Sequence, residues 1–366
     1  MTMKMNEHDS LPSLRRFPAE WEQHDCVLLA WPHEETDWAY MLDDARRCIA
    51  DIVRAISEEE CVMLVGPAEL CLSSVQEQNF NPERVRFVDM PTNDTWARDF
   101  GALTVEVDGS LRLLDFKFNG WGLKFAADKD NLITSRLAAK DMFGVGVENH
   151  LNFVLEGGSV ESDGEGTLLT TAECLLSPNR NGGWDKEQIS AYLAQSFGFN
   201  HQLYLHHGAL LGDDTDSHID TLARLAPYNT ILYCGAGEPD NPNHADLVKM
   251  QEELTTLRTP EGMPYNLIEL PLPDVIEIDG EVLPATYANF LITPTRILLP
   301  VYGQHRNDFL ASQVLRIAFP DHDVVPIDCV PLIRQHGSLH CVTMQFPKGA
   351  VSGIENGRWV SNKSLE

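Results

Sequence analysis

The sequence contains no apolar run that approaches the roughly 18 residues a membrane-spanning helix requires. Its first 13 residues are polar and lack the basic and apolar stretches of a secretion signal. The chain is also poor in basic residues, since 27 Lys and Arg stand against 55 Asp and Glu and give a net charge of -28. Such a protein repels phosphate backbones and anionic membranes but attracts small cations. We therefore predict a cytoplasmic protein that binds neither nucleic acid nor membranes.

The common metal-binding and disulfide patterns are absent as well. The eight cysteines are scattered and form no CxxC pair, which argues against both a zinc ribbon and a disulfide framework. There is no HExxH motif, and the adjacent His206 and His207 are predicted to point to opposite faces of a strand. The acidic stretch 213–220 lacks the spacing of a calcium loop. We therefore expect reduced thiols, while the density of aspartates at 213–220 still indicates either cation binding or catalysis.

What the sequence does contain is a regular alternation of predicted strands and helices across residues 1–366, without a linker or a low-complexity segment. Between residues 45 and 58, for example, apolar residues spaced three and four apart predict a helix with one buried face. A unit of strand, loop, helix and strand recurs roughly every 60 to 75 residues, about five times. This repetition predicts a single α/β domain, arranged as an open sheet or as a radial array. In a radial array, loops from distant repeats meet at one centre.

Three later segments carry more specific expectations. The alternating pattern of residues 337–345 predicts a strand that contains Cys341. Residues 286–292 and 297–301 are predicted to pair as a hairpin. The end of the acidic stretch is expected to open a short helix that continues through Leu225.

Three loops carry carboxylates at the ends of predicted strands. Asp99 lies in a loop with several unlike functional groups, and Glu156 follows an apolar run and precedes two glycines. His218 and Asp220 close a stretch of eight residues that holds four aspartates. Each loop also has a purely structural interpretation. Asp99 would form a solvated surface pair with Arg98, Glu156 would precede a glycine-rich turn, and the aspartates of 213–220 would cap a helix. A helix cap, however, does not explain His218 or Asp220.

A cysteine near the end of the chain adds a candidate nucleophile. A lone cysteine on a strand is usually a small buried hydrophobic residue. Cys341 is a candidate nucleophile only because a histidine and several carboxylates from the three loops are predicted to lie near it. The thiolate is the attacking species, and a nearby His218 would lower the thiol pKa from its usual value of about 8.5. The order of the two residues is the reverse of that in papain-like proteases. Several carboxylates disfavour a neutral amide substrate and favour a guanidinium, which they bind in bidentate fashion.

Five motifs, spread in order over nearly the whole chain, resemble those of the agmatine deiminase family. This family belongs to the bacterial-type peptidyl-arginine deiminases of the guanidine-modifying, or pentein, superfamily. The motifs are NDTWARD at 93–99, FNGWG at 118–122, EGGS at 156–159, the acidic stretch at 212–220 and the cysteine segment at 337–345. The resemblance implies a five-bladed α/β propeller with pseudo-fivefold symmetry. The repeated strand and helix units agree with that fold.

The resemblance also implies an activity and a role for each central residue. Cys341 attacks the guanidinium carbon of agmatine, and Asp99 and Asp220 hold the guanidinium nitrogens. His218, oriented and charged by Glu156, donates a proton to the leaving ammonia and then activates water against the thiouronium intermediate. The products are N-carbamoylputrescine and ammonia, formed in putrescine biosynthesis.

Other expectations concern the rest of the substrate and the assembly. Asp214, Trp96 and Trp121 are candidate contacts to the substrate chain or its amine, with the indoles offering cation–π faces. The binding partner is then a small cationic guanidine, which an acidic protein attracts. The expected reaction needs no metal and no cofactor, and a homo-oligomer is a possible assembly.

Three alternatives to agmatine deimination are compatible with the same residues. The first is a deiminase that acts on peptidyl or free arginine. An amidinotransferase would use the same covalent step with an amine acceptor, and a noncatalytic pentein would use the fold as a binding scaffold. The agmatine family commonly has Gly-Gly-Gly-Asn before its cysteine, whereas this chain has Gln-His-Gly-Ser at 335–338. Substrate specificity is therefore the least determined of these expectations.

Overall fold

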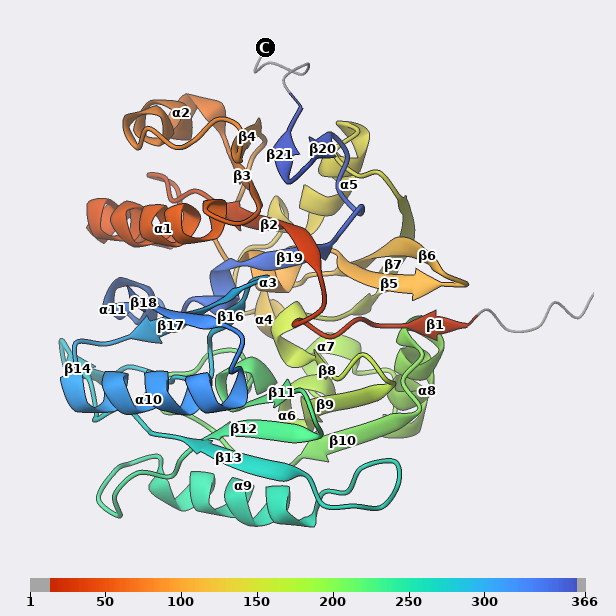
Figure 1. The fold of residues 1–366 in the computed structure, drawn as a ribbon, viewed down its shortest axis with the longest axis vertical. Helices are drawn as coiled ribbons and strands as arrows, with labels where there is room; N and C mark the ends of the chain where they lie inside the picture. Colours follow the sequence, from red (N-terminus) through yellow and green to blue (C-terminus); the bar gives the residue numbers. More distant parts are fainter. Residues whose placement is uncertain (1–13, 361–366) are drawn as a thin grey trace, which may run out of the picture.

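A computed structural model describes residues 14–360 of the chain (Figure 1). The polar segment 1–13, on which the absence of a secretion signal was argued, lies outside the described residues. Among the described helices, none has the length and apolar character needed to cross a membrane.

Most described strands belong to five separate sheets of three or four strands. In each sheet a middle strand pairs antiparallel with one neighbour and parallel with the other. We call the antiparallel neighbour, the middle strand and the parallel neighbour a trio. Written in that order, the trios are β5 (Leu103–Val107), β6 (Ser110–Lys117) and β7 (Gly146–Val154); β8 (Glu161–Ser162), β9 (Thr167–Thr171) and β10 (His201–Leu205); β11 (Ala223–Ala226), β12 (Thr230–Cys234) and β13 (Asn266–Leu270); β16 (Leu291–Ile292), β17 (Arg296–Val301) and β18 (Asp323–Asp328); β19 (Met344–Pro347), β2 (His24–Ala30) and β3 (Cys61–Gly66). The fold is therefore mixed α/β, built from one repeated unit.

Short strands complete two of these sheets and form two separate hairpins. β1 (Arg15–Arg16) extends the first sheet beside β5, and β4 (Val85–Asp89) extends the last beside β3. The hairpins are β14 (Glu277–Ile278) with β15 (Glu281–Val282), and β20 (Ile354–Glu355) with β21 (Arg358–Trp359).

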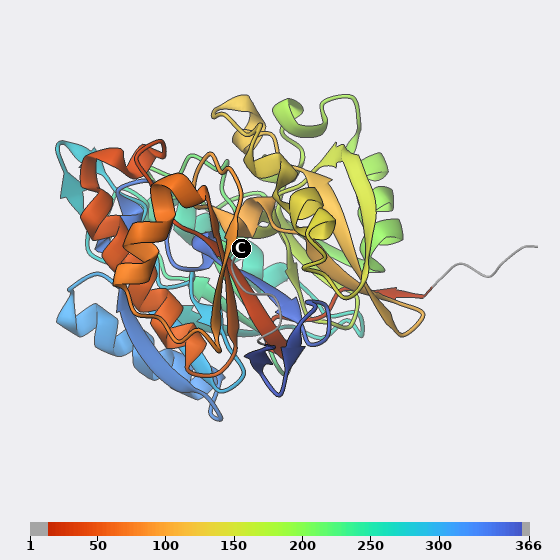
Figure 2. The ribbon, with the colours of Figure 1, turned by 90° about the horizontal axis from the view of Figure 1, so that it is seen from above.

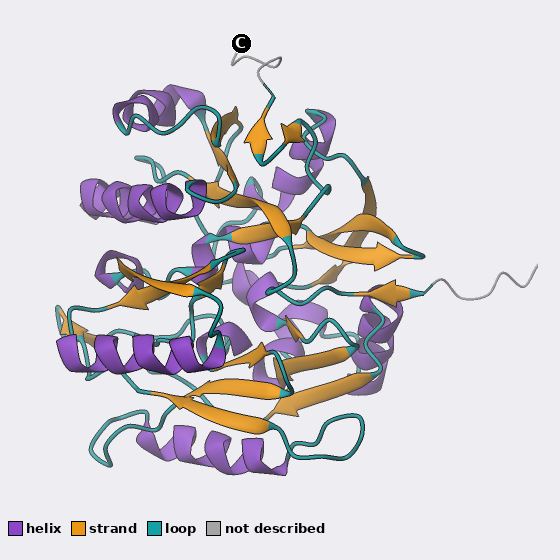
Figure 3. Cartoon of the chain, in the orientation of Figure 1, coloured by secondary structure: helices purple, strands orange, loops and turns teal. Residues whose placement is uncertain are grey.

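Every parallel pair is joined by a segment with a helix, because two parallel strands need a crossover connection. These helices are α1 (Leu42–Ser57), α5 (Ile133–Ala139), α8 (Lys186–Phe197), α9 (His244–Thr256) and α10 (His305–Ala318), with α2 (Ala68–Glu77) between β3 and β4. They lie on the outside of the molecule, around the strands (Figures 1 and 3). Seen from above, α1 and α2 lie on one side and α8 on the other (Figure 2). The predicted stripe on α1 is buried, with Ile49, Ile52 and Val53 fully covered.

The two ends of the described chain meet in one sheet. β19, which follows Cys341, pairs antiparallel with β2 near the N-terminus, and Met344 lies opposite Leu28. Residues of β2 and β3 are almost completely buried, as expected for strands covered on both faces. The last unit of the repeat is thus assembled from both ends of the chain, which fixes the cysteine segment against the N-terminal strands.

Each trio is preceded by a short turn, and the five turns contact one another in a ring. They are α3 (Ala97–Phe100), η3 (Gly157–Ser159), η4 (Ile219–Thr221), the bend at Asn289 and η5 (His340–Val342), where η denotes a 3₁₀ helix. The amide of Gly158 donates to Asp99, and η3 packs against η4. The side chain of Asn289 donates to the carbonyl of Asp220 and accepts from the amide of His340. The ring closes because η5 contacts α3.

Two expectations about local structure were wrong, and the predicted hairpin of β16 with β17 is confirmed but with a shorter first strand. Cys341 lies on the 3₁₀ turn η5 and not on a strand, because Asn289 accepts the amides of residues 340 and 341 before the ladder with β2 begins. The first hairpin strand is confined to Leu291–Ile292, because the backbone amides of residues 286 and 288 donate hydrogen bonds to side-chain hydroxyls and not to a neighbouring strand. The expected helix through Leu225 is only the turn η4, after which the chain enters β11.

Candidate active site

A cavity of about 250 Å³ opens on one side of the ring of turns. Five of the predicted site residues line it: Trp96, Asp99, Trp121, Asp214 and Cys341. The other three, Glu156, His218 and Asp220, are fully buried next to these. Acidic side chains, including Glu35 and Asp37, also line the cavity. The structure therefore brings all the predicted residues to one place.

Cys341 is almost completely buried at the wall of this cavity. Its Sγ lies 3.4 Å from Asn289 Oδ1, to which the thiol donates, and 4.0 Å from Asp220 Oδ2. Burial, followed by the charges of Asp220 and Asp99, raises the pKa of the Cys341 thiol well above its usual range. The expected lowering of this pKa by His218 is therefore wrong for the protein without a ligand, in which the thiol keeps its proton.

Asp99 is held by two donors from different motifs. Its Oδ1 accepts from the amide of Gly158 at 3.0 Å, and its Oδ2 accepts from Trp121 Nε1 at 2.9 Å. Trp121 reaches this position because its backbone is in the left-handed region, with φ of 55° between two glycines in the same region. Trp121 thus orients a carboxylate in addition to lining the cavity. Burial, with the nearby Asp220, raises the pKa of Asp99.

His218 lies among acidic groups, and neither of its ring nitrogens has a hydrogen-bond partner within residues 14–360. Its Nδ1 is 3.6 Å from Asp99 Oδ1, and its Nε2 is 3.9 Å from Glu156 Oε2. Burial alone would lower the pKa of His218, but Asp99, Cys174 and Glu156 outweigh burial and raise it well above its usual value. His218 is therefore an imidazolium at neutral pH, able to donate a proton.

A glycine gives His218 the space that it occupies. A Cβ added at Gly158 would lie 2.6 Å from His218 Nδ1 and 2.9 Å from Asp99 Oδ1. Such distances are far below van der Waals contact, so any side chain at this position would displace the imidazole or the carboxylate. The glycine pair after Glu156 is thus required for close approach of the backbone, as its sequence suggests.

Glu156 is fixed by an arginine that the sequence did not single out. Arg180 Nε donates to both Glu156 oxygens, at 3.1 and 2.8 Å, and its Nη1 donates to Asp216 at 2.6 Å. Arg180 Nη2 also donates to the carbonyl of Thr215 at 2.8 Å. One guanidinium therefore joins the Glu156 turn to the acidic stretch that carries His218.

Asp220 has one engaged oxygen and one free oxygen. Its Oδ2 accepts from His340 Nδ1 at 2.7 Å, whereas its buried Oδ1 has no partner among the described residues. Burial alone would raise the pKa of Asp220, but His340, His218 and Arg224 lower it below its usual value. Two neighbouring carboxylates, Asp99 and Asp220, thus have pKa values shifted in opposite directions, a common property of catalytic pairs.

The lining of the cavity is largely acidic, with Lys129 as a basic member that pairs with Glu35. Asp214 lines the cavity, and burial is the main cause that raises the pKa of Asp214 to about 6. His336, next to Asp214, also lines the cavity and binds the carbonyl of Gly212 through Nδ1 at 2.7 Å. Trp96 lies edge-on to Trp121, with ring centroids 6.5 Å apart. This lining suits a cationic group at the far end of a ligand.

Comparison with known proteins agrees with the motifs. The model of the Porphyromonas-type peptidyl-arginine deiminase family matches residues 16–347. The chain belongs to this family. The agmatine deiminase of Stutzerimonas stutzeri is 31% identical over 352 residues, covering 90% of this chain and 95% of that protein.

Solved structures of family members have the same fold. A Porphyromonas gingivalis protein provisionally described as an arginine deiminase is 48% identical, with a TM-score of 0.87, covering 92% of this chain and 99% of that one. A variant of the C. jejuni agmatine deiminase with substrate bound is 35% identical, with a TM-score of 0.86, covering 95% and 99%. The family resemblance inferred from the five motifs is thus confirmed.

Two groups of ligand-type side chains in residues 14–360 are close enough to surround a metal ion. They are Glu156 with Cys174 and His218, and Glu20 with Glu161 and His340. In both groups an arginine already donates to the carboxylates, Arg180 in the first and Arg224 in the second. Neither group therefore needs an ion to balance its charge. His206 and His207, predicted to lie on a strand, follow the end of β10, where their amides bind a glutamate.

Sequence reasoning missed three residues of this family member that contact the predicted site, namely Asn289, Arg180 and His340. Asn289 occupies the turn of the fourth trio, so an alignment of the five repeats would have found it. Arg180 lies in α7 (Pro178–Asn181), outside the five motifs, and no signal pointed to it. His340 precedes the cysteine in the sequence and was assigned to the opposite face of a strand.

Proposed function

We propose that the protein is an agmatine deiminase, which hydrolyses agmatine to N-carbamoylputrescine and ammonia. One observation carries the proposal: beside the Cys341 thiol, the buried Asp220 Oδ1 and both His218 nitrogens have no partner among the described residues. Unpartnered buried polar atoms are costly, so the site is built to be completed by a ligand. A guanidinium supplies donors to the carboxylates and places its carbon against the sulfur.

The positive charge of the substrate activates the nucleophile in this proposal. Asp99 and Asp220 raise the pKa of the free thiol, and a guanidinium bound between them offsets their charges. The thiol proton then passes to solvent water, and the Cys341 sulfur attacks the guanidinium carbon. Because a guanidinium is a poor electrophile, fixing it beside the sulfur supplies much of the rate enhancement.

His218 handles the protons of both half-reactions. As an imidazolium it donates a proton to the departing nitrogen, the C–N bond breaks, and ammonia leaves a thiouronium ester on Cys341. The neutral imidazole then takes a proton from water, which adds to the same carbon. The C–S bond breaks, the ureido product forms and the thiol is regenerated. Glu156, held by Arg180, keeps His218 charged and oriented.

The acidic lining of the cavity supports agmatine as the substrate. Agmatine carries an ammonium group at the end opposite its guanidinium, and Asp214 and Asp37 are acidic members of the cavity lining that could face it. The product has lost one positive charge, so the acidic cavity releases it more readily than it binds the substrate. The relatives named agmatine deiminase, at 31% and 35% identity, add to this support.

We also infer the arrangement of the whole chain from these features. The five trios form the blades of an α/β propeller with pseudo-fivefold symmetry, and the ring of contacting turns supports this arrangement. Residues 1–366 then make up one catalytic domain, with the active site on the axis. A cytoplasmic location and a homo-oligomeric assembly remain predictions.

A second candidate is the deimination of free arginine or of arginine in a peptide. The 48% identical Porphyromonas gingivalis protein favours it, as does His336 in the cavity lining. A histidine there offers a carboxylate-containing substrate a partner that agmatine does not need.

Ammonia release from agmatine, free arginine and a blocked peptidyl-arginine distinguishes these candidates. The proposal predicts release from agmatine alone, abolished by Cys341→Ala. Release only from arginine or from the peptide would favour the second candidate. If a folded protein released no ammonia from any of them, hydrolysis would be excluded in favour of an amidinotransferase or a scaffold.

A further inference from the structure

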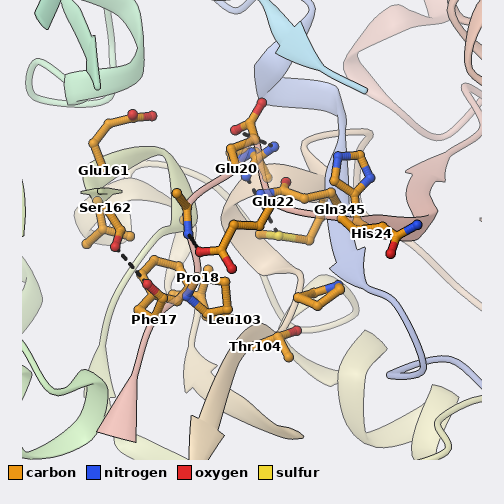
Figure 4. Close-up of a pocket in the computed structure, with 17 residues that line it drawn as sticks. Phe17, Pro18, Glu20, Glu22, His24, Leu103, Thr104, Glu161, Ser162 and Gln345 are labelled. Carbon is orange, nitrogen blue, oxygen red and sulfur yellow. Dashed lines mark hydrogen bonds and ion pairs between the residues drawn. The ribbon is translucent and has the colours of Figure 1, made fainter. Parts of the chain in front are cut away.

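The turns that carry the active-site residues also face a second group of charges. In α3, Asp99 lines the substrate cavity, whereas the preceding Arg98 lines a separate cavity of about 40 Å³. Glu20 and Glu161 line this second cavity too, with their carboxylates on the same side of it (Figure 4). In η5, likewise, Cys341 lines the substrate cavity while the preceding His340 points toward Glu20.

This second group, which we call the rear charge cluster, consists of Glu20, Glu161, Arg98 and Arg224. Arg224 Nη2 donates to Glu20 at 2.9 Å and its Nε donates to Glu161 at 2.5 Å, while Arg98 Nη2 lies 3.9 Å from Glu20. Two carboxylates therefore face two guanidiniums, and the cluster is balanced in charge.

His340 connects the rear charge cluster to the active site. Its ring is buried between two carboxylates, with Nδ1 2.7 Å from Asp220 Oδ2 and Nε2 2.7 Å from Glu20 Oε2. Arg224 Nη2 also lies 3.2 Å from His340 Nε2. Whether the ring is neutral or cationic, the carboxylate Asp220 can only accept, so Nδ1 carries a proton.

We propose that His340 is a positioning residue for Asp220. By engaging Oδ2, it fixes the carboxylate and leaves Oδ1 directed to the guanidinium of the substrate. The donated hydrogen bond also favours the anionic form of Asp220. Because Glu20 holds the other side of the ring, the imidazole cannot turn away from Asp220. The inference rests on the proposed function, in which Asp220 binds the guanidinium.

Three variants of His340 separate a donor to Asp220 from simple packing. His340→Ala removes the donor, His340→Asn retains an amide N–H near the position of Nδ1, and His340→Gln extends its amide toward Glu20 instead. A matched control is His24→Asn, because His24 is also buried and lies 2.7 Å from a glutamate, Glu60, but touches no active-site residue.

Two measurements are needed, agmatine binding by Cys341→Ala proteins over a range of pH, and the pH profile of kcat/KM with Cys341 present. For His340→Ala we expect agmatine to bind at least about tenfold more weakly. We also expect the acidic limb of the kcat/KM profile to lie about one pH unit higher, because Asp220 then retains its proton to higher pH. His340→Asn should restore both properties, and His340→Gln should not. The His24→Asn protein should be less stable, but the acidic limb of its kcat/KM profile should stay at the wild-type pH.

Other outcomes would overturn the inference. If His340→Ala and His24→Asn both lost stability but kept the affinity and the pH profile, His340 would serve packing alone. If His340→Ala did not fold, equal behaviour of the Asn and Gln variants would have the same meaning. If the parent Cys341→Ala protein did not bind agmatine and the wild type did not turn it over, the proposed function would fail, and this inference with it.

Discussion

The substrate cavity and the rear charge cluster both contain buried carboxylates, but these differ in whether an arginine of the protein donates hydrogen bonds to them. Around the cluster, Glu20 and Glu161 receive hydrogen bonds from Arg224. At the cavity, no described guanidinium donates a hydrogen bond to Asp99 or Asp220, and Asp220 Oδ1 lacks a partner within residues 14–360. The difference shows where the protein completes its own ion pairs and where it leaves the cation to be supplied by a ligand.

The same contrast appears in the titration of the groups. Burial opposes ionisation of Glu20, yet His340 and Arg224 lower the pKa of Glu20 well below its usual value. At the cavity, burial and nearby carboxylates raise the pKa of both Asp99 and Cys341. Glu20 is therefore ionised without a ligand, whereas a bound cation would favour ionisation of Asp99 and Cys341; Glu161, whose pKa burial raises, and Asp220, whose pKa His340 lowers, do not follow this contrast. The predictions below alter one of the two regions at a time.

The largest effect on stability is expected from breaking the rear charge cluster. Arg224→Leu leaves two buried carboxylates without their main partner, which should lower the free energy of unfolding by about 3–5 kcal/mol. Urea denaturation measures this loss. The control is Arg47→Leu, which removes an exposed pair with Asp44 and should cost less than about 1 kcal/mol. Similar losses in the two variants would contradict the contrast between the regions.

The opposite result is expected on the cavity side, where Asp99→Asn removes a carboxylate that faces the His218 ring at 3.6 Å and accepts no hydrogen bond from a guanidinium within residues 14–360. Turnover of agmatine should fall by about 10²–10³-fold, as for the loss of other groups that stabilise charge in an active site. Stability should change little, because the lost attraction to His218 is offset by relief of burial and of repulsion from Asp220. Asp115→Asn, a buried aspartate on β6, is a control that should retain activity. A destabilised Asp99→Asn protein would contradict the assignment of this residue to substrate binding.

How much of this contrast could be predicted from the sequence depends on whether a residue works locally. The strands, the crossover helices and the loops with Asp99, Glu156 and His218 follow from patterns within each segment. Cys341 was predicted to lie on a strand because its segment does alternate between apolar and polar residues. Asn289, distant in the sequence, accepts hydrogen bonds from the backbone amides of His340 and Cys341 and so prevents strand pairing there. The rear charge cluster joins residues from four separate segments, and no local pattern reveals such pairing.

A smaller effect is expected from Asp214 in the cavity lining. Since the pKa of Asp214 is raised to about 6, its charge is present above that pH and is lost below it. KM for agmatine should therefore rise as the pH falls, by up to about tenfold per unit below 6. Butylguanidine, which lacks the amine, should not show this rise, and Asp214→Asn should remove it for agmatine. Equal pH dependence for the two substrates would show that Asp214 does not bind the amine.

The most direct test of the account is a titration of Cys341 with and without guanidinium ion. The ultraviolet absorbance of the thiolate, taken as the difference between wild type and Cys341→Ser, reports this one cysteine. We predict a thiol pKa above the usual value of about 8.5 in the free protein and a fall of at least about one unit when guanidinium is bound. A pKa already below 7 without the cation, unchanged when it is added, would contradict the claim that the substrate completes this site.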